Sequence, residues 1–91
     1  MKKIILNEKE YEIIENYKES LNLEEVQHLF TDYFFEYDYI LGDYAYNKLR
    51  LKGFYDSKHK NVKKYNDIKE YKKYLEEYCA PECPYFLLKR K

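Results

Sequence analysis

The chain has 91 residues, no formal net charge, 45% hydrophobic residues and 20% aromatic residues. This length fits one domain with a modest core, and the aromatic content excludes an intrinsically disordered chain. The start lacks a signal-peptide core, and no apolar run approaches the ~20 residues that cross a membrane. The sequence therefore predicts one cytoplasmic domain over residues 1–91 with no membrane contact.

The first part of the chain predicts a hairpin followed by a helix. Residues 2–6 and 11–17 are rich in β-branched and aromatic residues and flank Asn7-Glu8-Lys9, a pattern typical of two strands joined by a turn. Asn22 with Glu25 three residues later is typical of a helix start. Apolar residues then recur at helical spacing, which predicts a helix over 23–36 with one apolar face.

The second part predicts two more strands, a helix and a final strand. In chain order we expect strands over 37–43 and 48–55 joined by residues 44–47, a polar loop over 56–66, a helix capped by Asp67, and a strand over 85–88. The resulting order β-β-α-β-β-α-β has no regular strand–helix alternation. It predicts a small α+β domain with a largely antiparallel sheet and two helices.

Charge is segregated along the chain although the total is zero. The charged residues over 8–43 are mostly acidic, and those over 48–73 are mostly basic. This asymmetry either creates a local basic patch or is neutralised when the two halves pack together, and both alternatives stay open. Arg50 and Arg90 are the only arginines in a lysine-rich chain. They mark positions that favour a planar, bidentate cation.

The segment over 37–60 contains the candidate binding surface. Alternation along the strand over 48–55 places Leu49 and Leu51 on a core face and basic residues with Phe54 on the other face. Lysines beside aromatic rings are what single-stranded nucleic acid requires, because cations neutralise phosphates and rings stack on bases. A solvated lysine-rich face is the alternative. The candidate ligand-binding residues are Asp43, Tyr44, Tyr46, Lys48, Arg50, Lys52, Phe54, Lys58 and Lys60.

The glycines and cysteines predict packing roles. Gly42 and Gly53 lie in predicted strands, where glycine marks a bulge or a close backbone approach, or makes room for a tyrosine ring, and we favour the tyrosine ring. Cys79 and Cys83 are expected to be reduced thiols, with Cys79 buried and Cys83 more accessible, and a reversible disulfide between them is the alternative. The chain lacks the clustered ligands that zinc requires, so we expect no metal and no cofactor.

Nearly the whole chain, including the opening stretch "YEIIENYKES" (11–20), resembles the YutD-like family, small uncharacterised cytosolic proteins of low-GC Gram-positive bacteria. "DYILGDYAYNKLRLKGFY" (38–55) resembles the core signature of that family, and "LEEYCAPECPYFLLKR" (75–90) resembles its C-terminal pattern. The chain departs from the signature at Tyr44, where the family tends to have Trp, and at Ala45 and Asn47, where it tends to have Gly. The resemblance implies a family and no activity.

Three functions remain open. The leading hypothesis is a non-enzymatic cytosolic binding module for RNA or another phosphate-bearing partner, acting through residues 37–60. The alternative is a protein-interaction adaptor or homodimer that uses exposed tyrosines. A small enzyme using Asp43 and Arg50 is third, because a carboxylate near a base is the minimum for acid–base chemistry.

Overall fold

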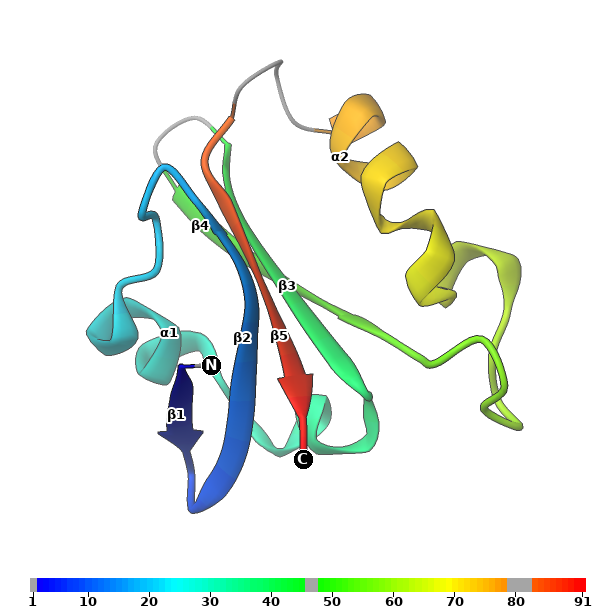
Figure 1. Cartoon of the computed structure of the whole chain (residues 1–91), viewed down its shortest axis with the longest axis horizontal. Helices are drawn as coiled ribbons and strands as arrows, with labels where there is room; N and C mark the ends of the chain where they lie inside the picture. The colour runs from blue at the N-terminus through cyan, green and yellow to red at the C-terminus, as the bar shows by residue number, and fades with distance from the viewer. Residues whose placement is uncertain (1, 46–47, 79–82) are drawn as a thin grey trace.

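The computed structural model describes residues 2–45, 48–78 and 83–91, and its elements follow the predicted order (Figure 1). The strands are β1 (Lys3–Leu6), β2 (Lys9–Tyr17), β3 (Tyr39–Ala45), β4 (Lys48–Phe54) and β5 (Tyr85–Arg90). The helices are α1 (Leu23–Leu29) and α2 (Tyr71–Tyr78), with 3₁₀ turns η1 (Asp32–Glu36), η2 (Lys64–Asn66) and η3 (Ile68–Glu70). The predicted α+β class is confirmed.

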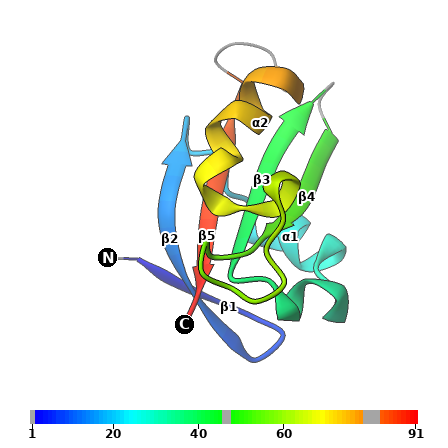
Figure 2. The ribbon, with the colours of Figure 1, turned by 90° about the vertical axis from the view of Figure 1, so that its right-hand side faces the viewer.

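The strands form one sheet in the order β1-β2-β5-β3-β4, and each neighbouring pair is antiparallel. β5, which comes last in the chain, lies in the middle of the sheet, where Phe86, Leu87 and Leu88 are buried. Figures 1 and 2 show α1 on one face of the sheet and α2 on the other. The sheet is therefore covered on both faces, and two separate clusters of apolar side chains form.

The first cluster lies between the sheet and α1. Its buried members are Leu6, Tyr11, Val26, Phe30, Ile40, Phe86 and Leu88. Both glycines lie under rings, because a Cβ added to Gly42 would lie 2.1 Å from the Phe86 ring, and one added to Gly53 would lie 2.3 Å from the Tyr37 ring. The predicted packing of a tyrosine ring is confirmed at Gly53, whereas the ring over Gly42 is a phenylalanine.

The second cluster lies between the sheet and α2, with Leu41, Phe54 and Leu87 buried at its centre. Glu15 on β2 fastens this layer by accepting hydrogen bonds from the Tyr71 hydroxyl and, at 3.0 Å, from the Tyr85 hydroxyl. Burial and the Glu15 carboxylate raise the pKa of Tyr85 to about 12. Burial and the same carboxylate also raise the pKa of Tyr71, so both hydroxyls stay protonated across the physiological pH range. The Tyr71 hydroxyl holds α2 to β2, and the Tyr85 hydroxyl links β5 to β2.

The predicted helix over 23–36 is interrupted. Asn22 caps it as predicted, accepting a hydrogen bond from the Glu25 amide at 3.2 Å, but α1 ends at Leu29 and Phe30 is extended. Phe34 and Phe35 of η1 both lie with their ring centroids within 6 Å of the Phe30 ring, at 5.8 and 5.6 Å. Successive residues of an α-helix point about 100° apart, so an unbroken helix would not bring both rings to one neighbour.

Strand boundaries also differ from the prediction. The first hairpin turns at Asn7 and Glu8, whose φ values of 48° and 68° are left-handed, so β2 begins at Lys9 and not at residue 11. β3 extends to Ala45 and therefore includes two residues that were predicted as loop. Tyr46 and Asn47, the rest of that predicted loop, lie outside the described residues.

Candidate functional site

The predicted alternation along β4 is confirmed. Leu49 and Leu51 pack against the α1-side cluster, whereas Phe54 is fully buried on the α2 side. Arg50 and Lys52 share the Phe54 face, because residues two apart in a strand point to the same side. The basic face of β4 therefore lies toward α2, and the part of it that α2 leaves uncovered is the part that a partner can contact.

Arg50 braces the β3–β4 hairpin against α2. It lies directly opposite Asp43 in the strand register, and its Nε donates a hydrogen bond to Asp43 Oδ1 at 2.8 Å. Its Nη2 donates to the carbonyl oxygen of Tyr78, in the last turn of α2, at 2.9 Å. Asp43 is only 1% exposed, and burial raises the pKa of its carboxyl while the Arg50 hydrogen bond opposes the rise. This arginine therefore links two strands and a helix.

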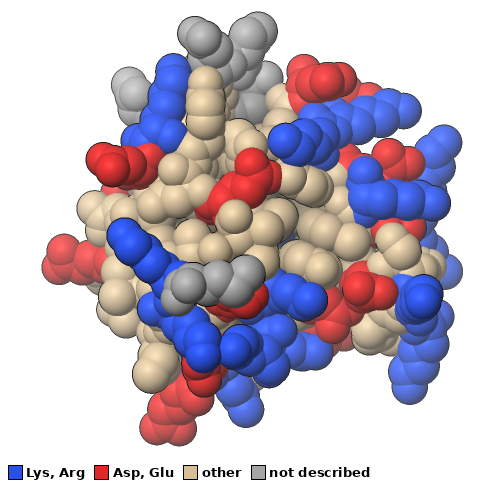
Figure 3. All heavy atoms as spheres, in the orientation of Figure 1, with Lys and Arg blue, Asp and Glu red and all other residues tan. Residues whose placement is uncertain are grey.

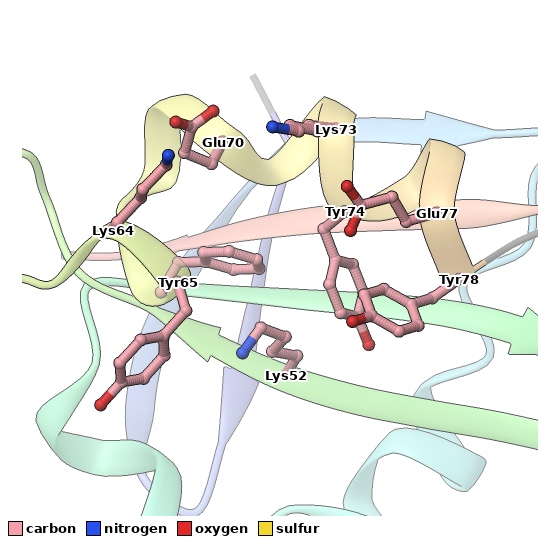
Figure 4. Close-up of a pocket in the computed structure, with 9 residues that line it drawn as sticks. Lys52, Lys64, Tyr65, Glu70, Lys73, Tyr74, Glu77 and Tyr78 are labelled. Carbon is pink, nitrogen blue, oxygen red and sulfur yellow. The ribbon is translucent and has the colours of Figure 1, made fainter.

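A groove with a volume of about 460 Å³ opens beside this brace, between β4, η2 and α2 (Figure 4). Figure 4 shows Tyr65 on one side, Tyr74 and Tyr78 on the other, and Lys52 between them. The lining residues are Lys52, Phe54, Lys64, Tyr65, Glu70, Lys73, Tyr74, Glu77 and Tyr78. The groove is thus aromatic and charged, and it is open to solvent.

The helical side of the groove has a simple spacing. Its residues at positions 70, 73, 74, 77 and 78 are three or four apart, so they project from one face of the helical segment. The rings of Tyr74 and Tyr78 pack together with centroids 4.9 Å apart. One face of α2 therefore supplies two rings, one cation and the Glu77 carboxylate, and Glu70 at the end of η3 adds a second carboxylate.

The groove lysines stand beside rings and not beside acids. The Nζ of Lys52 lies 5.1 Å from the Phe54 ring centroid and 5.4 Å from that of Tyr74, both within cation–π range. Among the described residues, Lys52, Lys64 and Lys73 have no carboxylate oxygen within 4.0 Å. Tyr65 is 70% exposed and Tyr78 is 58% exposed. Cations and ring faces are therefore both accessible here.

The structure brings only part of the predicted surface into this groove. Lys52 and Phe54 line it, whereas the Tyr44 hydroxyl donates at 3.1 Å to Glu25 of α1, on the opposite face of the sheet. Lys48, Lys58 and Lys60 are exposed but do not line the groove, and Tyr46 lies outside the described residues. Of the two alternatives for the segregated charge, neutralisation holds at Arg50, which is ion-paired to Asp43.

Charge on the visible face is mixed. Figure 3 shows lysines crowded over the 56–70 segment and the start of α2, with acidic side chains between them. In that region Lys69 pairs with Asp67, with 3.8 Å between Nζ and Oδ2, and Lys72 pairs with Glu15, with 3.9 Å between Nζ and Oε1. The basic character therefore belongs to particular unpaired lysines and is not spread over a whole face.

The cysteine prediction needs correction. Cys83 is disulfide-bonded, not the accessible thiol that a reduced chain would present, and Cys79 lies outside the described residues. His28 is exposed on α1, and the His59 ring stacks on the Tyr55 ring at 4.2 Å. Within the described ranges, no three His, Cys, Asp or Glu side chains gather in a way that would hold a metal ion.

Sequence reasoning missed most of the groove. The predicted site lacked Lys64, Tyr65, Glu70, Lys73, Tyr74, Glu77 and Tyr78. The available signal was the polar–aromatic spacing on the second predicted helix. The same spacing is typical of any solvent-exposed helix face, so it does not by itself indicate a binding site.

These features define a class: a small α+β domain with a five-stranded antiparallel sheet, one helix on each face, and an open aromatic–lysine groove. Residues 5–89 match the family described as "Putative antitoxin YutD-like", and the chain belongs to this YutD-like family. It is 38% identical over 87 residues to "Putative antitoxin YutD" of Bacillus subtilis (strain 168), which covers 96% of each chain.

A solved structure agrees with the fold. The solution NMR structure of protein yutD from B. subtilis superposes with a TM-score of 0.83 at 36% identity, covering 100% of this chain and 83% of that one. In the described part of the chain, no helix has the length and apolar character required to cross a membrane. The family resemblance of the sequence is thereby confirmed, together with the architecture.

Proposed function

We propose that this chain is a non-enzymatic, cytoplasmic binding module that holds single-stranded RNA in the groove between β4, η2 and α2. The observation that carries the proposal is the alternation of accessible rings with lysines that have no acidic partner among the described residues. Rings such as Tyr65 stack on bases, and lysines such as Lys52 neutralise phosphates. A folded duplex offers no exposed base faces, so a single strand fits these side chains better.

The layout of the groove supports this partner. Tyr65 stands across from Tyr74 and Tyr78, and Lys52 lies between the two sides (Figure 4). A base stacked on either side would place its phosphate within the region that the lysine side chains reach. Because Arg50 is engaged with Asp43 and with the Tyr78 carbonyl, the phosphate contacts are assigned to Lys52, Lys64 and Lys73.

A protein partner is the second candidate, favoured by a different surface. The curated relative is described as "Putative antitoxin YutD", a description that fits a protein partner for that relative. On this chain Leu29 is 43% exposed at the end of α1 and Tyr33 is 62% exposed in η1. An adaptor or homodimer would use this apolar and aromatic area and leave the groove free.

The test is a titration of fluorescently labelled single-stranded RNA at several salt concentrations, followed by anisotropy. Single-stranded phosphate contacts lower the logarithm of the binding constant by about 0.7 per contact for each unit rise in the logarithm of salt. Lys64→Gln should weaken binding and reduce that slope by about 0.7. Lys18→Gln is the matched control, because Lys18 is exposed in the turn after β2, outside the groove.

Two results would contradict the proposal. One is absence of binding to RNA of any sequence by a protein that unfolds cooperatively and is therefore folded. The other is an equal loss of RNA affinity in Lys64→Gln and in the control Lys18→Gln. Concentration-dependent dimerisation measured by analytical ultracentrifugation, lost in a Tyr33→Ala variant, would favour the second candidate.

A further inference from the structure

The groove contains carboxylates that RNA binding by charge alone does not explain. Glu70 and Glu77 line it together with the lysines, and Glu77 is exposed. Among the described residues, neither carboxylate has an ion pair or a side-chain hydrogen bond. A phosphate beside such a group is repelled, so these acids face some other part of the bound strand.

Glu77 occupies the more informative position. It lies one turn after Tyr74 and directly before Tyr78, the two rings whose centroids are 4.9 Å apart. Figure 4 shows its carboxylate beside the Tyr74 side chain, on the groove side of α2. A base stacked on either ring would lie next to this carboxylate, so an acceptor is within reach of the base edge.

The chemistry of a carboxylate limits which base edge fits. An ionised carboxylate only accepts hydrogen bonds, so it pairs with the amino groups of cytosine, adenine or guanine and repels the carbonyl oxygens of uracil. Guanine fits best, because its N1–H and N2 amino group are adjacent donors that match the two oxygens of one carboxylate.

We propose that the groove selects bases that carry an amino group on the pairing edge, guanine foremost, with Glu77 as the acceptor. This inference rests on the proposed RNA binding at the same groove. It adds base selection to that binding. The lysines then supply affinity that is independent of sequence, and one glutamate supplies discrimination between bases.

The test uses two oligouridines of equal length that carry one central guanosine or one central inosine, which differ by a single amino group. The wild-type protein should bind the guanosine oligonucleotide about fivefold more tightly, the lower end of the discrimination by one base-edge contact. Glu77→Ala should lose this preference and bind the two oligonucleotides with a ratio close to one, because the acceptor that distinguishes the amino group is gone. Glu76→Ala is the matched control, because the adjacent Glu76 is exposed and does not line the groove.

The outcomes separate this inference from the proposed function. Binding of both oligonucleotides with equal affinity by the wild-type protein would overturn base selection and leave RNA binding in place. A preference for guanosine that survives in Glu77→Ala would show that another group reads the base. Failure of the wild-type protein to bind either oligonucleotide would remove the proposed function itself.

Discussion

Arg50→Lys should destabilise the fold. The arginine fork donates simultaneously to Asp43, which is 1% exposed, and to the Tyr78 carbonyl oxygen, at 2.8 and 2.9 Å. A lysine ammonium reaches one of these acceptors but cannot serve both with the same planar geometry. Loss of one charge-assisted hydrogen bond predicts a decrease of about 1.5 kcal/mol in the free energy of unfolding. Arg50→Met, which leaves Asp43 buried without its cation, should cost about 3 kcal/mol.

Urea unfolding followed by circular dichroism measures both losses. The matched control is Lys48→Ala, on an exposed side chain of the same strand, and should stay within about 0.5 kcal/mol of wild type. RNA affinity, corrected for the folded fraction, should be nearly unchanged in Arg50→Lys. If Arg50→Lys keeps wild-type stability but loses tenfold in RNA affinity, the structural role of Arg50 is contradicted and a direct contact between Arg50 and the RNA is indicated.

Two further predictions concern the sheet. Gly42→Ala should lower the free energy of unfolding by about 3 kcal/mol, because the added Cβ meets the fully buried Phe86 ring. Gly53→Ala should lower it by only about 1 kcal/mol, because the half-exposed Tyr37 ring can move. Equal urea midpoints for the two variants would contradict this difference. The pKa of the Asp43 carboxyl is raised in the folded state above its ordinary value of 3.8 in the unfolded chain. As pH falls, the folded state therefore binds a proton on Asp43 before the unfolded chain does, and the contribution of Asp43 to stability should increase. Wild type should therefore gain stability relative to Asp43→Asn when urea unfolding is repeated from neutral pH toward about pH 4, and a constant difference would be evidence against the shift.

Most elements of the fold could be predicted from local sequence patterns. The Asn22 cap, the alternation in β4 and the strand-rich first hairpin all depend on residues within a few positions, so the sequence alone predicts them. The break after Leu29 was missed because it depends on how Phe30 packs in the tertiary structure. Helical periodicity cannot show such packing.

The candidate site was only partly predictable for the same reason. Lys52 and Phe54 were found from strand alternation, but Tyr78 lies far away in the sequence and reaches the groove only because α2 packs over β4. The Asp43–Arg50 contact depends on strand register, which leaves no signature in either strand alone. A lone arginine therefore pointed to an important position without indicating whether its partner was a ligand or the protein.

The most direct test of RNA binding in the groove compares Tyr65→Ala with Tyr33→Ala. Both rings are highly exposed, at 70% and 62%, but only Tyr65 lines the groove. Tyr65→Ala should weaken binding of single-stranded RNA by roughly 1 to 3 kcal/mol, the range for loss of one stacked base, while thermal unfolding stays close to that of wild type. Tyr33→Ala should bind RNA as wild type does. Equal effects of the two substitutions, or a loss confined to Tyr33→Ala, would contradict the assignment of this groove.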